Sequence, residues 1–387
     1  MKIGIDVRPL QDSSKFRGIG YYLSHLLIYL SKIDKKNEYF FFGFSAELPQ
    51  LKKLEEGFKF HFEQQGKTTV HELRYKLEST LFPSLNLPSK KLDLFLATDV
   101  SYGMPKGKHK TLGVIYDVTP LLSPSPKPLK ERLIWSAGRW LYKTSFERFR
   151  KADKLISISE STKKDFLNFF DYQDEDIVVT PLAQDEIFRP APHGNQSVLK
   201  KYGIEPPYIL CVGGCDFRKN LAGLIPAFER VALEIEDLHL VLVGGDFVSG
   251  RDPDSLRVRK LIERSPFKEK IVCPGYIPLE EMPLFYSGAE VFVYPSLYEG
   301  FGLPILEAMA CGCSVIAYKN SSIPEVAGNA ALLIDSDEEL SAAIERVIKD
   351  KSLRRTLVKK GFEQSKKFSW EKTVQKTLKV FEEVGEK

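Results

Sequence analysis

Two glutamates, Glu299 and Glu307, flank a segment of glycines and proline, Gly300-Phe-Gly-Leu-Pro304. Glycines at 300 and 302 permit a tight turn whose backbone can come close to a ligand. Pro304 suits the first position of a helix, where its missing amide hydrogen costs nothing. The segment therefore predicts a loop that leads into a helix. Glu299 would lie in the loop and Glu307 one helical turn further along, roughly 5 Å away at 1.5 Å per residue.

The first amides of this helix would have no partner inside the helix itself. Phe301, Gly302 and Leu303 would present such donors at the positive end of the helix dipole, an arrangement that favours a phosphate. The carboxylates of Glu299 and Glu307 accept hydrogen bonds and suit hydroxyl groups on either side of a diphosphate. These groups together are typical of a site for a nucleotide sugar. The alternative is a capped helix with two solvated glutamates.

The same segment resembles a known family. Glu-x7-Glu within Glu-Gly-Phe-Gly-Leu-Pro, followed by Glu-Ala-Met-Ala-Cys-Gly and by Ile323-Pro-Glu-Val326, resembles the retaining glycosyltransferases of family 4. The resemblance implies transfer of a hexose from a nucleotide diphosphate to a hydroxyl group, with retention at the anomeric carbon. It also implies that no metal ion or other cofactor is needed, because arginine, lysine and a helix N-terminus act on the diphosphate.

The resemblance assigns roles to the residues of this segment. Glu307 would bind the ribose hydroxyls of the donor, and Glu299 would act as a catalytic residue at the donor hexose. The donor-binding backbone would come from four consecutive residues, Gly300, Phe301, Gly302 and Leu303. We expect a front-face reaction in which the leaving phosphate oxygen takes the acceptor proton, since no enzymic nucleophile is evident.

A second turn, Val212-Gly-Gly-Cys-Asp-Phe-Arg-Lys-Asn220, follows a predicted strand and opens a predicted helix. Arg218 and Lys219 would meet the diphosphate there, because preorganised cations at a departing nucleoside diphosphate stabilise the transition state more than the ground state. The resembled family uses an arginine and a lysine of this turn, although its arginine often comes earlier, near Gly214. The Arg-Lys-Asn form resembles a subgroup of mannosyl- and O-antigen transferases. The alternative is a pair of surface charges that cap a helix.

Two further glycine-containing turns resemble donor-binding turns of the family. In Arg17-Gly-Ile-Gly-Tyr21, Gly18 and Gly20 would let the loop approach the donor phosphate, or would serve only the packing of helix on strand. Tyr276 and Ile277 follow Gly275 in a turn that resembles the one whose backbone contacts the nucleobase.

A segment at the end of a predicted strand departs from the family pattern. Val114-Ile-Tyr-Asp-Val-Thr-Pro120 matches a family segment in which His-Asp is frequent, and Tyr116 stands at the position of the histidine. A tyrosine hydroxyl could donate a hydrogen bond to a sugar oxygen but is no base at neutral pH. Asp117 would orient the acceptor hydroxyl or act as a structural cap.

Short apolar runs alternate with amphipathic stretches along the chain, which predicts βα units and parallel sheets. At 387 residues the chain is too long for one typical core, so two domains are expected. Predicted strands lie at residues 2–7, 39–44, 92–97, 111–116, 155–159, 177–180, 208–212, 238–243, 271–273, 290–294, 314–317 and 331–334. Predicted helices begin near 18 and cover 221–233, 254–264, 303–310, 337–349, 352–367 and 370–384.

The expected fold class is α/β of the GT-B type, with two Rossmann-like, doubly wound domains that face a central cleft. Residues 1–188 would form the N-terminal, acceptor-binding domain, and residues 201–369 the C-terminal, donor-binding domain. Proline and glycine between 189 and 200 predict a linker. The resemblance implies that the last helix, within 370–387, packs back on the first domain.

Residues 127–154 carry nine basic side chains against three acidic ones, with aromatic residues among them. A basic helix with interfacial aromatics predicts peripheral contact with anionic lipid. The alternative is a solvated face on a helix whose aromatics fill the core. Nucleic acid is not an expected partner, since no nucleic-acid-binding module accompanies the charge.

The remaining composition is that of a cytoplasmic enzyme. No run approaches the ~18 apolar residues of a membrane span, and the N-terminus resembles no signal peptide. We expect the protein in the cytoplasm, with the basic segment at the inner face of the membrane. Five cysteines lack paired CxxC spacing, and no ligand cluster has metal-binding spacing, so neither disulfides nor a metal site are expected.

These observations predict a hexosyltransferase, with mannose from GDP-mannose as the first candidate donor and a glycan or lipid-linked acceptor in surface polysaccharide synthesis. Two alternatives stay open. A non-catalytic partner subunit that binds nucleotide sugars would explain Tyr116 and the displaced arginine. A nucleotide-sugar epimerase would need acid and base groups at the donor carbon, which the sequence does not identify.

Overall fold

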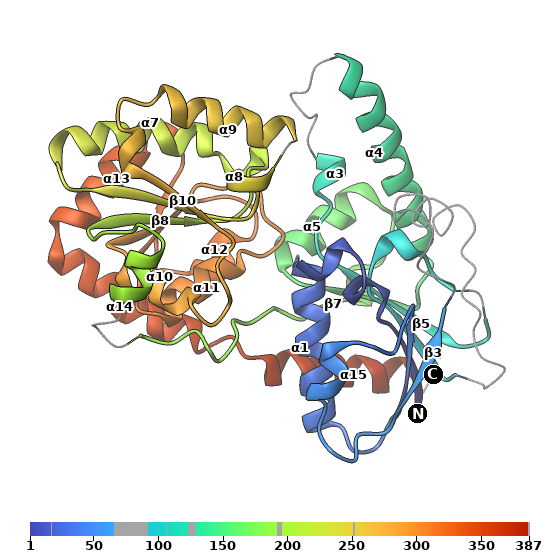
Figure 1. Cartoon of the computed structure of the whole chain (residues 1–387). Helices are drawn as coiled ribbons and strands as arrows, with labels where there is room; N and C mark the ends of the chain where they lie inside the picture. The colour runs from blue at the N-terminus through green and yellow to red at the C-terminus, as the bar shows by residue number, and fades with distance from the viewer. Residues whose placement is uncertain are drawn as a thin grey trace. The chain divides into compact units, whose positions relative to one another are not determined.

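The computed structural model describes residues 1–16, 18–65, 92–105, 107–122, 129–191, 196–250 and 252–385. Contacts between residues divide the chain into two compact units (Figure 1). Unit 1 comprises Met1–Leu182 and Trp370–Lys387, and unit 2 comprises Ala183–Ser369.

Unit 1 is built on a sheet of seven strands in the order β3-β2-β1-β4-β5-β6-β7. All of its pairings are parallel. The strands are β1 (Lys2–Asp6), β2 (Glu38–Gly43), β3 (Phe60–Gln64), β4 (Leu94–Ala97), β5 (Lys110–Ile115), β6 (Lys154–Ser157) and β7 (Ile177–Val179). Strand β4 is buried at every position, as expected of a parallel strand covered on both faces. The strand order reverses direction at β1, which is the doubly wound pattern.

The helices of unit 1 are α1 (Gly18–Ile33), α3 (Thr119–Leu122), α4 (Leu129–Phe149), α5 (Glu160–Phe169) and α15 (Trp370–Gly385). Helix α1 has the predicted apolar face, and Leu23, Leu26 and Leu27 on it are fully buried. Helix α15 packs against α1, where the Trp370 ring stacks on His25 with centroids 4.7 Å apart. The sequence-distant C-terminal helix is therefore part of the core of unit 1.

The aromatic residues of α4 divide into two groups. Phe146 and Phe149 are buried in the core of unit 1, so for these two the alternative, that the aromatics fill the core, is correct. Trp140, by contrast, is 60% exposed. The guanidinium of Arg139 donates a hydrogen bond to the carbonyl oxygen of Leu121 at 2.7 Å. The helix thus combines a core face with an exposed tryptophan.

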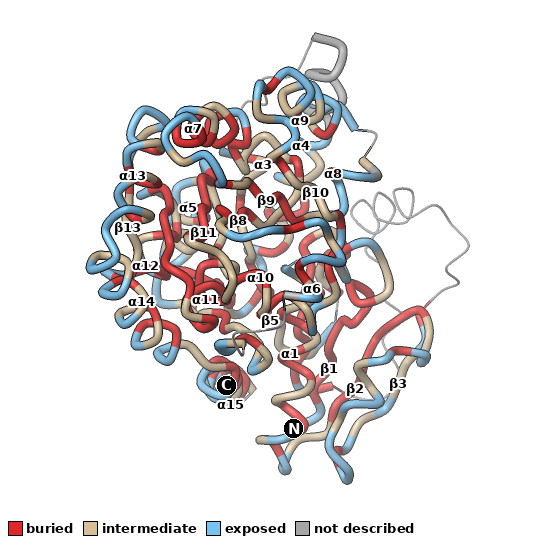
Figure 2. Tube along the Cα trace, turned by 60° about the vertical axis from the view of Figure 1, so that its left-hand side comes forward, coloured by how far each residue is buried: buried red, intermediate tan, exposed pale blue. Residues whose placement is uncertain are grey.

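Unit 2 has a sheet of six strands in the order β10-β9-β8-β11-β12-β13, again with parallel pairings throughout. The strands are β8 (Tyr208–Val212), β9 (His239–Val243), β10 (Ile271–Gly275), β11 (Val291–Tyr294), β12 (Val315–Tyr318) and β13 (Leu332–Ile334). Strands β8 and β9 consist almost entirely of buried residues, whereas α13 shows exposed ones (Figure 2). The order reverses at β8, so the carboxyl ends of β8 and β11 form a topological switch point where ligands bind in such sheets.

Nine helices of unit 2 are α6 (Gln196–Lys201), α7 (Leu221–Glu234), α8 (Asp246–Ser249), α9 (Pro253–Arg264), α10 (Met282–Gly288), α11 (Leu303–Ala310), α12 (Ile323–Ala327), α13 (Asp337–Lys349) and α14 (Lys351–Ser365), counted over the described part of the chain. Helices α7 and α13 pack on the sheet through buried side chains such as Leu224, Phe228, Leu340 and Ile344. Part of the predicted linker, from residue 196 onward, is helical as α6; residues 192–195 lie outside the described chain.

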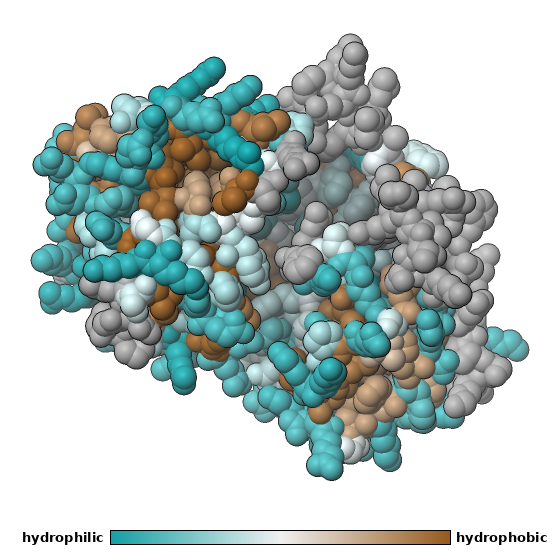
Figure 3. All heavy atoms as spheres, viewed as in Figure 1, coloured by the Kyte–Doolittle hydropathy of each residue, from teal (hydrophilic) through white to brown (hydrophobic). Residues whose placement is uncertain are grey.

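Each predicted strand is present, and its ends differ from the prediction by two residues at most. Strand β3 was not predicted, because its sequence Phe-His-Phe-Glu-Gln mixes polar and aromatic residues at the edge of the sheet. No described helix is long and apolar enough to span a membrane. Over the described residues of the face shown in Figure 3, hydrophilic side chains separate smaller hydrophobic patches.

Candidate active site

The turn after β8 is shaped by glycines and capped by an aspartate. A Cβ added at Gly213 would lie 3.3 Å from Cε of Lys219, and one added at Gly244 would lie 1.9 Å from the carbonyl oxygen of Gly213. Only glycine therefore fits at 244, where the ends of β8 and β9 approach each other. The Asp216 carboxylate accepts a hydrogen bond from the amide of Arg218 at 2.9 Å and starts the short 3-10 helix Phe217–Lys219.

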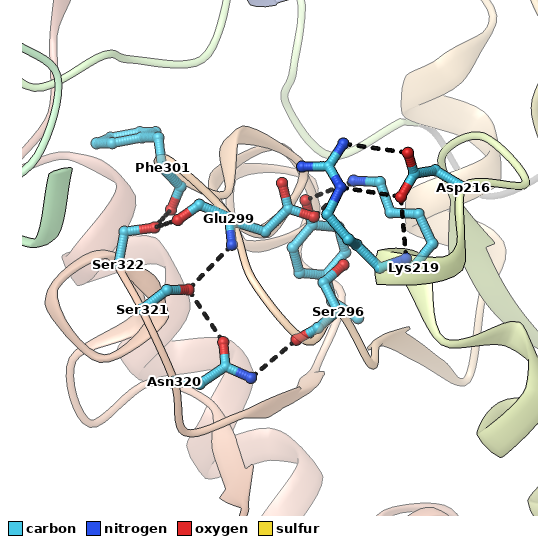
Figure 4. A network of polar contacts seen from close by, with 10 residues as sticks. Asp216, Lys219, Ser296, Glu299, Phe301, Asn320, Ser321 and Ser322 are labelled. Carbon is cyan, nitrogen blue, oxygen red and sulfur yellow. Dashed lines mark hydrogen bonds and ion pairs between the residues drawn. The ribbon is translucent and has the colours of Figure 1, made fainter. Parts of the chain in front are cut away.

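Lys219 forms an ion pair with Glu299, which follows the neighbouring strand β11. Its Nζ lies 2.6 Å from Oε1 of Glu299 and 3.2 Å from the hydroxyl of Tyr294 (Figure 4). The two charged side chains are only 21% and 15% exposed. A main-chain hydrogen bond of 2.7 Å from the amide of Leu297 to the carbonyl oxygen of Arg218 joins the same two turns.

Both members of this pair are charged in the folded protein. Burial by itself would lower the pKa of Lys219, but the Glu299 carboxylate outweighs it and the pKa is raised. Burial would likewise raise the pKa of Glu299, yet the nearby ammonium group of Lys219 holds it below its usual value. The site therefore contains a neutralised ion pair rather than an unpaired cation.

Arg218 is held by a carboxylate of its own turn. Its Nε donates to Oδ1 of Asp216 at 2.9 Å and its Nη2 to Oδ2 at 3.3 Å. The pKa of Asp216 is lowered, because the hydrogen bond and charge of Arg218 outweigh the effect of burial. Each of the two predicted diphosphate-binding cations thus faces an acidic side chain in this structure.

The loop after Glu299 turns into α11 at Gly302, whose φ of +104° favours glycine. Helix α11 begins at Leu303, in agreement with the predicted range 303–310, and Pro304 is therefore its second residue and not its first. Among the described residues, none accepts a hydrogen bond from the amides of Phe301, Gly302 or Leu303. These donors lie at the N-terminus of α11, shortly after Glu299 in the chain.

Glu307 lies on the first turns of α11 and is buried. Its Oε2 accepts a hydrogen bond of 2.8 Å from the hydroxyl of Tyr286 on α10. Burial raises the pKa of Glu307 to about 7, with the Tyr286 hydrogen bond opposing this and the charge of Asp185 adding to it. The carboxyl group can therefore lose or hold its proton near neutral pH.

The two residues predicted near the nucleobase differ in exposure. Gly275 ends β10 with a φ of +83°, and a Cβ added there would lie 3.2 Å from Cγ2 of Val248. Tyr276 follows with 73% of its surface exposed, whereas Ile277 is buried. The turn after β10 thus has the exposed ring of Tyr276 and lies beside α8. It is at the carboxyl ends of the strands, as Lys219 is.

In unit 1, the two glycines of the first turn play different structural parts. A Cβ added at Gly20 would lie 2.5 Å from Cα of Lys15, so this glycine is needed for packing. A Cβ added at Gly18 would meet nothing within 4 Å. Arg17 lies outside the described residues. Packing therefore requires glycine at position 20, whereas Gly18 has open space beside it.

Tyr116 and Asp117 follow β5 and have different surroundings. The Tyr116 hydroxyl is buried without a hydrogen-bond partner in the described part of the chain, and its ring contacts Tyr22 edge-on at 5.4 Å. Burial raises the pKa of Tyr116, which keeps the hydroxyl protonated. Asp117 Oδ1 accepts a hydrogen bond from the amide of Thr119 at 2.9 Å, a cap for α3.

Three side chains of this site were not identified from the sequence. Asp216 and Tyr294 lie inside the two segments that were singled out, and their positions at the ends of β8 and β11 were a usable signal. Tyr286 belongs to a helix that was not predicted, so nothing in the sequence pointed to its contact with Glu307. In the described part of the chain no three His, Cys, Asp or Glu side chains gather as metal ligands.

Comparisons with known proteins identify relatives. Residues 196–364 match the model for glycosyl transferases group 1. O-antigen chain mannosyltransferase B of Escherichia coli is 32% identical over 285 residues, which are 73% of this chain and 72% of that protein. Serotype-specific mannosyltransferase WbdA of Escherichia coli is 28% identical over 280 residues, 70% of this chain but only 33% of that longer protein.

Solved structures agree on the fold. Sucrose-phosphate synthase from Thermosynechococcus elongatus has a TM-score of 0.75 at 20% sequence identity, over 99% of this chain and 98% of that one. Together with the two parallel-sheet units, this likeness confirms the predicted GT-B fold.

Proposed function

The chain belongs to the glycosyl transferases of group 1, and on that premise we propose that it transfers mannose from GDP-mannose to a glycan or lipid-linked hydroxyl group. The proposed setting is the synthesis of a surface polysaccharide. The choice of mannose is supported by the two Escherichia coli relatives, both of which are named mannosyltransferases. The proposed reaction retains the configuration of the anomeric carbon.

The observation that carries this proposal is the ion pair of Lys219 and Glu299 at the switch point of unit 2. In chain order, the pair is followed at once by the open amides of residues 301–303. A diphosphate would find a lysine and backbone donors there, while the carboxylate would accept hydrogen bonds from sugar hydroxyls. A nucleotide sugar has both kinds of group side by side.

We assign the diphosphate to Arg218, Lys219 and the amides at the start of α11. As the bond between sugar and phosphate breaks, negative charge grows on the β-phosphate, and positive groups fixed beside it stabilise this charge without reorganising. The leaving phosphate oxygen would take the proton of the acceptor hydroxyl on the same face of the sugar. These groups would perform the role that a divalent cation has in metal-dependent transferases.

The remaining donor contacts are assigned to two places in unit 2, the helix α11 and the turn that follows β10. Glu307 would accept hydrogen bonds from the ribose hydroxyls, for which its carboxyl group must be ionised. The backbone of Tyr276 and Ile277 would contact the nucleobase. In unit 1, Gly18, Gly20, Tyr116 and Asp117 are assigned to the acceptor and the donor sugar, and α4 to peripheral contact with a membrane.

A thermal-shift panel with GDP, UDP, ADP, dTDP and their sugars, each with and without EDTA, tests the donor assignment. A ligand at 100 times its Kd stabilises a protein by about 2.7 kcal/mol. We expect GDP and GDP-mannose to raise the melting temperature, with no effect of EDTA and with loss of the shift in Lys219→Ala. A shift from another nucleotide would overturn the choice of GDP.

Turnover separates the proposal from its alternatives. Incubation with the stabilising nucleotide sugar and a series of mannosides should release the nucleoside diphosphate, and NMR of the product should show an unchanged anomeric configuration. Binding without turnover of any acceptor would indicate a partner subunit. Conversion of the donor into an isomeric nucleotide sugar would indicate an epimerase.

A further inference from the structure

Three consecutive residues of the turn between β12 and α12, Asn320, Ser321 and Ser322, contact the loop that carries Glu299. The Oγ of Ser321 accepts a hydrogen bond from the amide of Glu299 at 3.0 Å. The Nδ2 of Asn320 donates to the carbonyl oxygen of Ser296, also at 3.0 Å (Figure 4). The loop is therefore held at Glu299 itself and three residues before it.

Ser322 holds the same loop on the other side of Glu299. Its hydroxyl lies 2.9 Å from the carbonyl oxygen of Glu299 and 2.7 Å from that of Phe301, and the residue is 0% exposed. In a trans peptide the N–H points opposite to the C=O. The amides of Gly300 and Gly302 consequently point away from Ser322. The turn thus fixes the direction of these backbone N–H groups. It also fixes the main chain of Glu299, from which the carboxylate side chain extends.

Ser321 adopts a backbone conformation that is unfavourable for serine. Its φ is +46°, and in the described part of the chain the other non-glycine residue with a positive φ is Asn220, at +51°. Asn220 directly follows Lys219 in the chain, and Ser321 binds the amide of Glu299. The two residues with positive φ therefore lie beside the two members of one ion pair. Strain of this kind persists where the surrounding structure enforces it, and it concentrates at functional sites.

The hydroxyl of Ser321 is itself oriented by its neighbour. It donates to Oδ1 of Asn320 at 3.0 Å, which leaves its lone pairs toward the amide of Glu299. The left-handed conformation is what brings this hydroxyl to the loop. A glycine at 321 would adopt the same φ without strain but would lose the contact.

We propose that Asn320, Ser321 and Ser322 are positioning residues for Glu299 and for the amides that follow it. The proposal rests on the proposed function, in which Glu299 meets the donor sugar. With Lys219 binding its carboxylate and this turn binding its backbone, Glu299 is held from both sides. A shift of ~1 Å in such a group lowers a reaction rate by about 100-fold.

The test compares Ser321→Gly and Ser322→Ala with a matched control, Ser314→Ala. Ser314 is also buried (2% exposed) and also donates to a carbonyl oxygen, that of Glu290 at 3.1 Å, but it precedes β12 at the opposite edge of the sheet. We expect kcat to fall about 10- to 100-fold in the first two variants, with a smaller change in the KM for the donor. Ser314→Ala should keep its kcat.

Stability separates positioning from a general structural role. Ser321→Gly should lower the melting temperature no more than Ser314→Ala does, because relief of the positive φ offsets part of the loss of its two hydrogen bonds, and yet it should lose activity. Ser322→Ala should lower the melting temperature as much as Ser314→Ala does. A loss of kcat in Ser314→Ala equal to that in Ser322→Ala would overturn the proposal.

A double variant tests whether the turn acts through Glu299. In a Glu299→Gln background, Ser321→Gly should add little to the loss of kcat, because Ser321 contacts this loop at Glu299 itself and residues that act as one unit are not additive. Full additivity of the two losses would contradict a positioning role.

Hydrogen exchange keeps this test independent of the proposed donor. If the wild type turns over no nucleotide sugar, the proposed function fails, but the amide of Glu299 should still exchange several-fold faster in Ser321→Gly than in wild type or in Ser314→Ala. An unchanged exchange rate would show that the turn does not hold the loop.

Discussion

The Nζ of Lys219 lies 2.6 Å from Oε1 of Glu299, although 80 positions separate the two residues in the chain. One follows β8 and the other follows β11, and these strands are neighbours in the parallel sheet of unit 2. The carboxylate of Glu299 binds the ammonium group of Lys219 in this structure. A diphosphate bound at Lys219, as proposed above, would share or displace this contact, and donor binding would then be linked to the position of Glu299.

The ion pair should be visible as a coupling energy in stability. Lys219→Met and Glu299→Gln each leave one buried charge without its partner, and each should lower the free energy of unfolding by about 3 kcal/mol. The double variant should lose less than the sum, with a coupling of about 1–3 kcal/mol. Urea unfolding of the four proteins at pH 7 measures this, and strictly additive losses would speak against the pair.

Glu307 should make the folded protein less stable as pH rises. Its pKa is about 7 in the folded protein against an ordinary value of 4.5, so the folded state binds the proton more tightly than the unfolded state. The stabilisation is complete below pH 4.5 and is lost as pH rises to 7. The difference of 2.5 pKa units, at 1.36 kcal/mol each, corresponds to about 3 kcal/mol.

Comparison with Glu307→Gln isolates this effect, because Asp216 and Glu299 have lowered pKa values and act in the opposite direction. The stability of the variant relative to wild type should increase between pH 4.5 and 7 and be constant above. Urea unfolding across pH 4.5–8.5 measures the difference. A difference that does not change with pH would mean that Glu307 titrates normally.

The same titration should control donor binding, if the ribose hydroxyls donate to an ionised Glu307. Nucleotide affinity in the wild type should rise as pH passes through 7, and calorimetric titrations at pH 6 and 8 would detect this. In Glu307→Gln the affinity should be lower and should lose this rise. An identical pH dependence in both proteins would assign the ribose contact elsewhere.

Asn220 should be replaceable by glycine more easily than by alanine. Its φ of +51° is comfortable for glycine and unfavourable for alanine by about 1 kcal/mol. Both variants lose the hydrogen bonds from Nδ2 to Asp337 at 2.7 Å and to the Tyr318 hydroxyl at 3.3 Å. Urea midpoints should therefore decrease in the order wild type, Asn220→Gly, Asn220→Ala. Equal midpoints of the two variants would indicate that this turn is not strained.

The exposed part of α4 should contribute to membrane binding. Trp140→Ala and Lys143→Gln should each weaken binding to vesicles that contain anionic lipid, the lysine by about fivefold, which corresponds to ~1 kcal/mol per charge. Leu233→Ala, at another exposed apolar residue, is the matched control and should bind as the wild type does. Cosedimentation with anionic and neutral vesicles distinguishes the outcomes. Equal binding of all variants would leave α4 without this role.

Most strands and helices could be predicted from the sequence because they depend on local patterns. Apolar runs such as 208–212 and 291–294 are buried on both faces of a parallel sheet, and their composition alone marks them as strands. The helix at 303–310 was predicted with its ends, since glycine at 302 and proline at 304 act within one turn. Strand β3 escaped prediction because an edge strand needs no apolar run.

The partners of the charged side chains could not be read in the same way. Arg218 and Lys219 are adjacent in sequence, yet one binds Asp216 in its own turn and the other binds Glu299 from the next strand. Nothing in the sequence singled out Ser321 and Ser322, because their contacts are with the loop of Glu299, which follows another strand. Such contacts depend on which strand ends adjoin, and adjacency in a parallel sheet does not follow chain order.

The sequence by itself determined the fold class and the two segments, 212–220 and 294–310, that carry the candidate donor site, because short-range spacing of glycine, proline and charge is sufficient for a turn before a helix. The tertiary structure alone decided that Lys219 is neutralised by Glu299, that Glu307 is buried against Tyr286, and that Ser321 is strained. Each of these depends on burial and on neighbours brought by other strands, which raise or lower a pKa and orient a loop.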